Sequence, residues 1–152
     1  MKLDQFPDSS RIWIYTANRA VADAEQRELA TPILGFLDQW AAHGTALKAT
    51  GAWLNDFQLL IALDESQAGA SGCSIDSQTR FLRELGKQHN IDWFNRLSMV
   101  VEENETIQLI PFAELSQHAD ALLFDPLVET LGDIRDNWPI PVQECRYKHL
   151  IS

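Results

Sequence analysis

A thiol, an imidazole and two carboxylates are the side chains in this sequence whose types and order suit chemistry. Cys73 lies between Ser71 and Ser74, just before a predicted helix, and His43 and Glu65 each follow a predicted element. The partial positive charge at a helix N-terminus favours a thiolate. We expect His43 to act as the base of Cys73, and Asp64 or Glu65 to orient His43, which is the arrangement of an activated nucleophile.

Other interpretations of these residues stay open. A cysteine among small residues is more often a buried small hydrophobe, and a histidine near a helix C-terminus is a favourable end charge. The amides of Ser71, Gly72 and Ser74 would also bind an anion without any thiol chemistry. The four histidines show no metal-ligand spacing, so the sequence predicts neither a metal nor a cofactor.

Five segments have the composition of strands, and two have that of helices. The predicted strands span 11–16, 45–54, 57–63, 97–102 and 106–111. The first predicted helix runs from Asp23 to about His43, and Gly44 supplies a left-handed end. Pro32 either kinks this helix or begins a second one that Thr31 caps. The second helix is predicted to begin at Ser74 as N-cap, with Asp76 in its first turn, and to run to Gly86 or Asn90.

The order of these elements to residue 102 is β-α-β-β-α-β, which is typical of a ferredoxin-like α+β fold. This fold predicts an antiparallel sheet of spatial order 4-1-3-2 with both helices on one face. It would bring the end of the first helix, the end of strand 57–63 and the loop 71–76 to one edge. We expect helices at 112–119 and 127–137, an extended segment at 138–141, an edge strand at 142–150, and a single domain over 1–152.

Charge and composition limit the partners that we expect. The chain has 12 basic and 22 acidic residues, a net charge of −10, and no basic stretch that would follow a phosphate backbone. Nucleic acid and anionic membranes are therefore excluded as partners. The start of the chain lacks a signal-peptide pattern, and Cys73 and Cys145 lie too far apart for a zinc or CxxC motif. These features predict a cytoplasmic protein of bacterial type, whose partner is another protein or a second copy.

Several stretches resemble a small bacterial family of uncharacterised proteins that often carries the automatic name "ABC transporter ATPase". They are Arg11–Tyr15, Gln39–Gly44, Asp64-Glu65, Ala70–Asp76 and Phe94–Arg96. The resemblance covers most of the chain to about residue 120, and Ala70–Asp76 is its most specific part. It implies no established activity and therefore assigns no catalytic residue.

The family name itself is tested by the motifs of nucleotide hydrolases. Leu59–Glu65 is similar to a Walker B strand, and Ser71-Gly72 is similar to the ABC signature, but the signature precedes Walker B in ABC ATPases. None of the seven glycines begins the phosphate-binding pattern GxxxxGK[ST]. The sequence therefore predicts no ATP hydrolysis. It favours a non-catalytic binding or assembly module, and the alternative is a thiol-dependent enzyme or a redox or anion-binding protein that uses Cys73 with His43.

Overall fold

The fold is mixed α and β, and its first sheet contains three antiparallel strands. The computed structural model describes residues 3–151. Strand β5 (Gln58–Asp64) lies between β1 (Arg11–Thr16) and β4 (Lys48–Asn55), and it pairs with both. All of its residues are buried, because both faces of this sheet are covered. The predicted central position of strand 57–63 and its hairpin with the preceding strand are confirmed.

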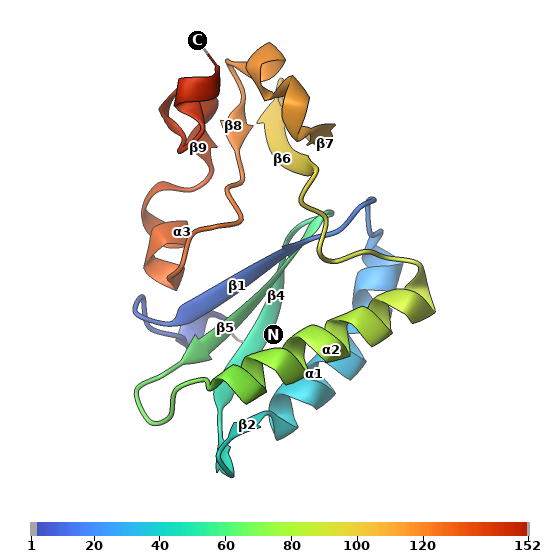
Figure 1. The fold of residues 1–152 in the computed structure, drawn as a ribbon, viewed down its shortest axis with the longest axis vertical. Coiled ribbons are helices and arrows are strands. Elements are labelled where there is room, and N and C mark those ends of the chain that lie inside the picture. Colours follow the sequence, from blue (N-terminus) through green and yellow to red (C-terminus); the bar gives the residue numbers. More distant parts are fainter. Residues whose placement is uncertain (1–2, 152) are drawn as a thin grey trace.

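Two long helices cover one face of this sheet (Figure 1). Helix α1 (Asp23–Gln39) is continuous through Pro32, so the prediction of one helix holds and Thr31 begins no second one. Helix α2 (Gly72–His89) is capped by Asn90, the later of the two predicted ends, and Asn90 has a left-handed conformation. The opposite face is covered by the short 3₁₀ helix η1 (Leu3–Gln5) and by helix α3 (Leu131–Asn137).

The strand predicted to complete the first sheet belongs to a second sheet instead. Strand β6 (Ser98–Glu103) pairs with β7 (Thr106–Pro111) and with β8 (Leu122–Leu123), and β8 pairs with β9 (Ile140–Pro141). Figure 1 shows this sheet beyond the β1 edge of the first. The α+β class is thus observed, whereas the ferredoxin-like order 4-1-3-2 is not confirmed. Among residues 3–151, no strand takes the place of the fourth strand beside β1.

The segments that differ most from the sequence-based expectations are short and irregular. His43 and Gly44 do not end α1: both have positive φ and form the turn between β2 (Ala41–Ala42) and β3 (Thr45–Ala46). Two central residues with positive φ are typical of a type I′ hairpin. The predicted helix 112–119 is the 3₁₀ helix η2 (Phe112–His118), and only 131–137 of the predicted helix 127–137 is helical.

The predicted edge strand at 142–150 is wrong. This segment forms the 3₁₀ helices η3 (Val142–Glu144) and η4 (Lys148–Leu150), which pack on the second sheet. Val142 and Cys145 point into the core of that sheet and are almost completely buried. Burial of two residues three apart requires a helical turn, because a strand would place such residues on opposite faces. Within residues 3–151, no helix has the length and apolarity needed to cross a bilayer.

Candidate functional site

Helix α2 begins with a capping box rather than with Ser74 as its cap. Ser71 is the N-cap: its side chain accepts from the Ser74 amide at 3.1 Å, and the Ser74 hydroxyl accepts from the Ser71 amide at 2.8 Å. Asp76 consequently lies beyond the first turn. Ser71 and Ser74 were predicted to bind an anion through their amides, but both amides donate hydrogen bonds within the capping box. Gly72 is exposed and keeps its amide at the helix start, where such groups have no partner within the helix.

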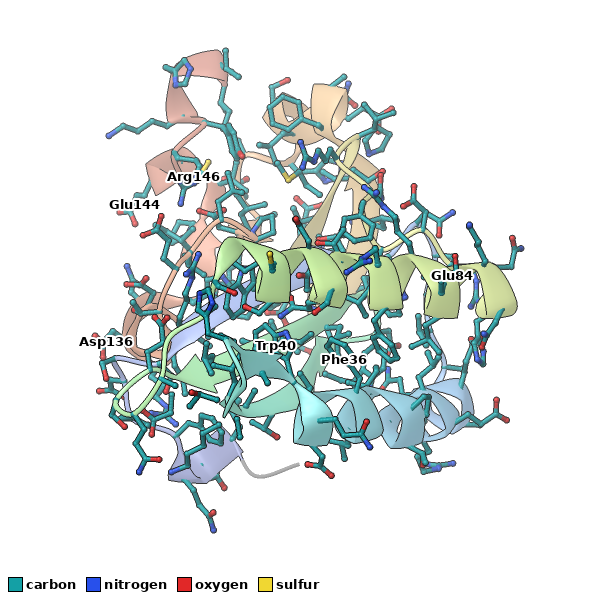
Figure 2. All side chains as sticks on the ribbon, turned by 60° about the horizontal axis from the view of Figure 1, so that its bottom comes forward. Phe36, Trp40, Glu84, Asp136, Glu144 and Arg146 are labelled. Atoms are coloured by element: carbon teal, nitrogen blue, oxygen red, sulfur yellow. The ribbon has the colours of Figure 1, made fainter. Side chains whose placement is uncertain are left out.

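The predicted thiol site places Cys73 and His43 on the surface. Cys73 is exposed in the first turn of α2, and His43 is exposed at the tip of the β2–β3 hairpin. The two elements are neighbours, because the Trp40 indole at the end of α1 donates to the Ser74 carbonyl at 2.8 Å. Figure 2 shows Phe36 and Trp40 projecting from α1 towards α2. Within the described residues, no hydrogen bond or ion pair joins Cys73, His43 and Glu65, so their shared chemistry remains a prediction.

The two carboxylates at the end of β5 are both used locally. Asp64 is buried, and its carboxylate accepts from the Ser66 amide at 3.0 Å, which holds the pKa of Asp64 below its usual value. Lys48 lies 3.5 Å from the same carboxylate. Glu65 accepts from the Ala70 amide at 3.1 Å and so closes the loop between β5 and α2. Both carboxylates therefore stabilise the loop between β5 and α2 by accepting hydrogen bonds from its main-chain amides.

A groove runs along the outer edge of β1, where the fourth strand was expected. It consists of two adjoining hollows with volumes of about 560 and 570 Å³. Both hollows include Trp13, Ile14 and Tyr15, and both include Pro126 and Leu127 on the opposite wall. We call the two hollows together the β1 groove. Each has the size of a typical small-ligand site, for which volumes of about 300–1,000 Å³ are usual.

The walls of the β1 groove come from three parts of the chain. The first hollow continues to the segment 126–130, and the second continues to α2, to residues 93–96 and to the second sheet. The apolar lining of the second hollow includes Ile75, Phe94, Met99 and Tyr147. Leu127 is 54% exposed and is one of the few large apolar side chains that face water. The second hollow is therefore largely apolar and open to water, whereas the first has a mixed polar and apolar lining.

The floor of the groove carries unpaired main-chain groups. The Ile12 amide donates to the Glu129 carbonyl at 3.0 Å, so Ile12 faces away from β5. Alternation along an antiparallel strand turns both main-chain groups of Ile14 to the same side. Within residues 3–151, no hydrogen bond reaches these Ile14 groups from outside the sheet. Bridges at Arg11–Thr130 and Thr16–Phe94 close the two ends, so the open stretch lies at the middle of β1.

The two ends of the groove differ in charge. Arg96 is exposed in the second hollow and makes no ion pair with any described residue. At the other end, Arg11 lies over the Trp13 ring, 4.7 Å from its centre. Glu65 and Glu129 lie in the same hollow as Arg11, so the charges of these three side chains sum to −1. The Arg96 end is thus positive in a chain whose net charge is −10.

Buried polar contacts hold the two walls in place. On one side, the Tyr15 hydroxyl donates to the Gln78 side-chain carbonyl and fixes β1 to α2. On the other, the buried Asp125 carboxylate accepts from Arg146 Nε at 2.7 Å and from the Leu127 amide at 2.9 Å. Figure 2 shows Arg146 on the C-terminal segment above the helices. The wall at 126–127 is therefore tied to the end of the chain.

Sequence reasoning missed this groove, because its residues carry no chemical signal of their own. Ile14 and Trp13 belong to a pattern that predicts a strand, and such residues are normally core. The one available signal was Leu127, an apolar residue that follows Asp125 and Pro126 in a stretch of turn-forming residues. Its exposure could not be derived, because the residues that face it across the second hollow lie at least twenty positions away in the sequence, and Ile75 lies more than fifty away.

Comparisons with known proteins do not assign the site. No family model matches the sequence, no curated protein matches it, and no solved structure matches the fold. Among residues 3–151, no group of three or more histidine, cysteine, aspartate or glutamate side chains is arranged to hold a metal ion. The function must therefore be argued from the geometry alone.

Proposed function

We propose that this chain is a non-catalytic protein-binding module that captures its partner in the β1 groove. The carrying observation is the open middle of β1, where the main chain of Ile14 faces a groove with one largely apolar hollow and one of mixed polarity. A sheet edge with free amide and carbonyl groups is a template for another chain. Apolar walls add the burial that gives such contacts their affinity.

The charge of the chain supports a protein as the partner. A net charge of −10 disfavours nucleic acid and anionic lipid surfaces, which are themselves negative. The groove offers apolar walls and main-chain groups, which suit a polypeptide. Four of the five sequence stretches that resemble the "ABC transporter ATPase" family contribute to the lining of this groove, through Arg11–Tyr15, Glu65, Ile75 and Phe94–Arg96.

Site-specific photocrosslinking tests the proposal. A photoreactive amino acid replaces Leu127 in one variant and Leu150 in another; the two leucines are 54% and 57% exposed, and Leu150 lies outside the groove. We expect one adduct with a defined protein from position 127 only. That protein is then purified and titrated with the unmodified chain. Equal adducts at both positions, or an adduct that fails to bind when purified, would overturn the proposal.

The second candidate is a thiol-dependent enzyme, or a redox or anion-binding protein, that uses Cys73 with His43. Its supporting observation is that Cys73 is exposed at the start of a long helix, beside the hairpin that carries His43. The test is the pH dependence of Cys73 alkylation, followed by mass spectrometry, with His43→Ala as the second variant. Reaction at pH 6 that slows in His43→Ala supports this function, and a rate with no such dependence removes it.

A further inference from the structure

We propose that the occupant of the β1 groove is a short extended segment of the partner, apolar at its centre and acidic at the end that lies near Arg96. This inference rests on the proposed function and specifies what the groove recognises. The segment would add itself to the first sheet as the strand missing beside β1. It would hydrogen-bond to the outward main-chain groups of Ile14 and extend along both hollows.

The geometry selects an extended chain over a helix. Only the amide and carbonyl of a strand lying about 4.7–4.9 Å from β1 reach the Ile14 groups. A helix satisfies its own main-chain groups and would leave those of Ile14 unpaired. Trp13 and Ile14 point to opposite sides of β1, and alternate residues of an added strand do the same.

The charges select the ends of the segment. Arg96 is exposed and unpaired among the described residues, so a carboxylate near it would gain an ion pair. The opposite end holds Arg11 together with Glu65 and Glu129, whose charges sum to −1. A segment whose acidic end lies near Arg96 therefore fits the groove better than one whose acidic end lies beside Glu65 and Glu129.

A second folded copy does not fit as the occupant. The free edge of β1 lies on the floor of the groove, below the walls at Leu127 and Ile75. Two such floors cannot approach to the spacing of paired strands, because the walls of both copies would collide first. The partner must therefore present its strand in a flexible or protruding segment.

The experiment uses fluorescent eight-residue peptides with capped ends and a central run of valines. One carries two glutamates at its amino end, another carries them at its carboxyl end, and the control peptides carry lysines instead. We expect one acidic peptide to bind more tightly than its lysine counterpart. Arg96→Gln should weaken that acidic peptide by about 1.4- to 5-fold, the contribution of an exposed ion pair.

Main-chain recognition is tested on the peptide itself. Methylation of alternate amide nitrogens blocks one edge of a strand and leaves the other edge free. We expect one set of methylations to weaken binding by about 2- to 10-fold per lost hydrogen bond, and the other set to leave it unchanged. In the free protein, the Ile14 amide should exchange with solvent faster than those of Trp13 and Tyr15, and bound peptide should slow it.

The protein variants are Leu127→Asn in the groove and Leu150→Asn as a control of matched exposure. Binding should weaken in the first and stay unchanged in the second. Any of three results would overturn the inference. They are an equal loss of affinity from both methylation patterns, an Ile14 amide exchange rate that bound peptide does not change, and equal affinities of the lysine and glutamate peptides. If these occur while the purified crosslinked partner still binds, the proposed function survives and only the extended segment is wrong. A dimer in sedimentation that Leu127→Asn dissociates would instead make a second copy the occupant.

Discussion

The hydrogen bond between Tyr15 and Gln78 offers a quantitative test of how the groove is held together. Tyr15 lies on β1 and is 9% exposed, and Gln78 lies on α2 and is fully buried. The Tyr15 hydroxyl donates to the side-chain carbonyl of Gln78. The Gln78 side-chain nitrogen has no hydrogen-bond partner among the described residues. The contact is thus a buried polar pair that is only partly satisfied.

The three variants of this pair should have unequal costs. Tyr15→Phe leaves both polar atoms of Gln78 buried and unpaired, which costs about 1–3 kcal/mol in the free energy of unfolding. Gln78→Met leaves the Tyr15 hydroxyl unpaired but removes the unpaired nitrogen, so its cost should be smaller. The double variant removes every polar atom of the pair and should be close to the native stability. The cost of the double variant should therefore fall below the sum of the single costs by about 1 kcal/mol or more.

Urea unfolding of the four proteins at pH 7 measures these free energies from the midpoint and slope of each transition. A double variant whose cost equals the sum of the two single costs would refute the reasoning, because the residues would then act independently.

Alkaline pH supplies a second measurement on the same pair. Burial raises the pKa of Tyr15 above its ordinary value of 10.0, so the folded protein keeps the hydroxyl protonated where the unfolded chain ionises. Stability should fall as the pH rises above about 10, and part of that fall should be absent in Tyr15→Phe.

Three further predictions concern the thiols, the ion pair of the buried Asp125, and ATP. One thiol per native chain should react with a thiol reagent, and two in denaturant, because Cys73 is exposed whereas Cys145 is buried; two reactive native thiols would contradict this. Arg146→Met should lower the free energy of unfolding by about 1.5–3 kcal/mol, since it strips a charged hydrogen bond from the buried Asp125. Arg135→Met loses an ion pair with the exposed Asp8 and a hydrogen bond to the Leu3 carbonyl, both at the surface, and should cost less than Arg146→Met. Calorimetric titration with millimolar ATP and Mg²⁺ should show no saturable heat, and micromolar binding would disprove this.

Elements with a strong local pattern could be predicted from the sequence. The face of α1 that contains Leu29, Ile33 and Leu37 follows from helical spacing, and all three are buried. The turn at Asn104 and Glu105 lies between two strand-forming runs, and the hairpin of β6 and β7 forms there. In such elements the residues that decide the structure lie within a few positions of one another.

The pairing of β6 could not be predicted, because it depends on distant residues with a weak pattern. Met99, Val100 and Val101 are all buried, and such a continuous apolar run suits the interior of any sheet. Its neighbour β8 contains only Leu122 and Leu123, which are too few residues to show alternation. The ferredoxin-like prediction placed β6 beside β1. In the structure, β6 pairs with β8, which follows residue 118, instead of with β1.

The candidate site shows the same division between local and distant information. The start of α2 was predicted to within three residues, because capping is local, although the N-cap is Ser71 rather than Ser74 and Cys73 lies inside the first turn. The groove depends on Ile14 and Leu127, which are more than one hundred residues apart in the sequence and unremarkable in type. Residue types alone therefore predict a site at the Cys73 thiol, whereas the topology indicates a site at the open edge of β1.

The open edge of β1 is also restrained against uncontrolled association. A free strand edge is an aggregation hazard, and proteins usually shorten or cover it. Here the Ile12 amide is paired with Glu129, and the bridge between Thr16 and Phe94 occupies the far end. Only the middle of the strand around Ile14 stays open, below walls that exclude another folded sheet. Because both ends are already fixed, a short segment would meet a site that needs little reordering, and such preorganisation lowers the entropic cost of binding. The same features that keep the edge from pairing with another folded copy therefore suit it to a short extended segment.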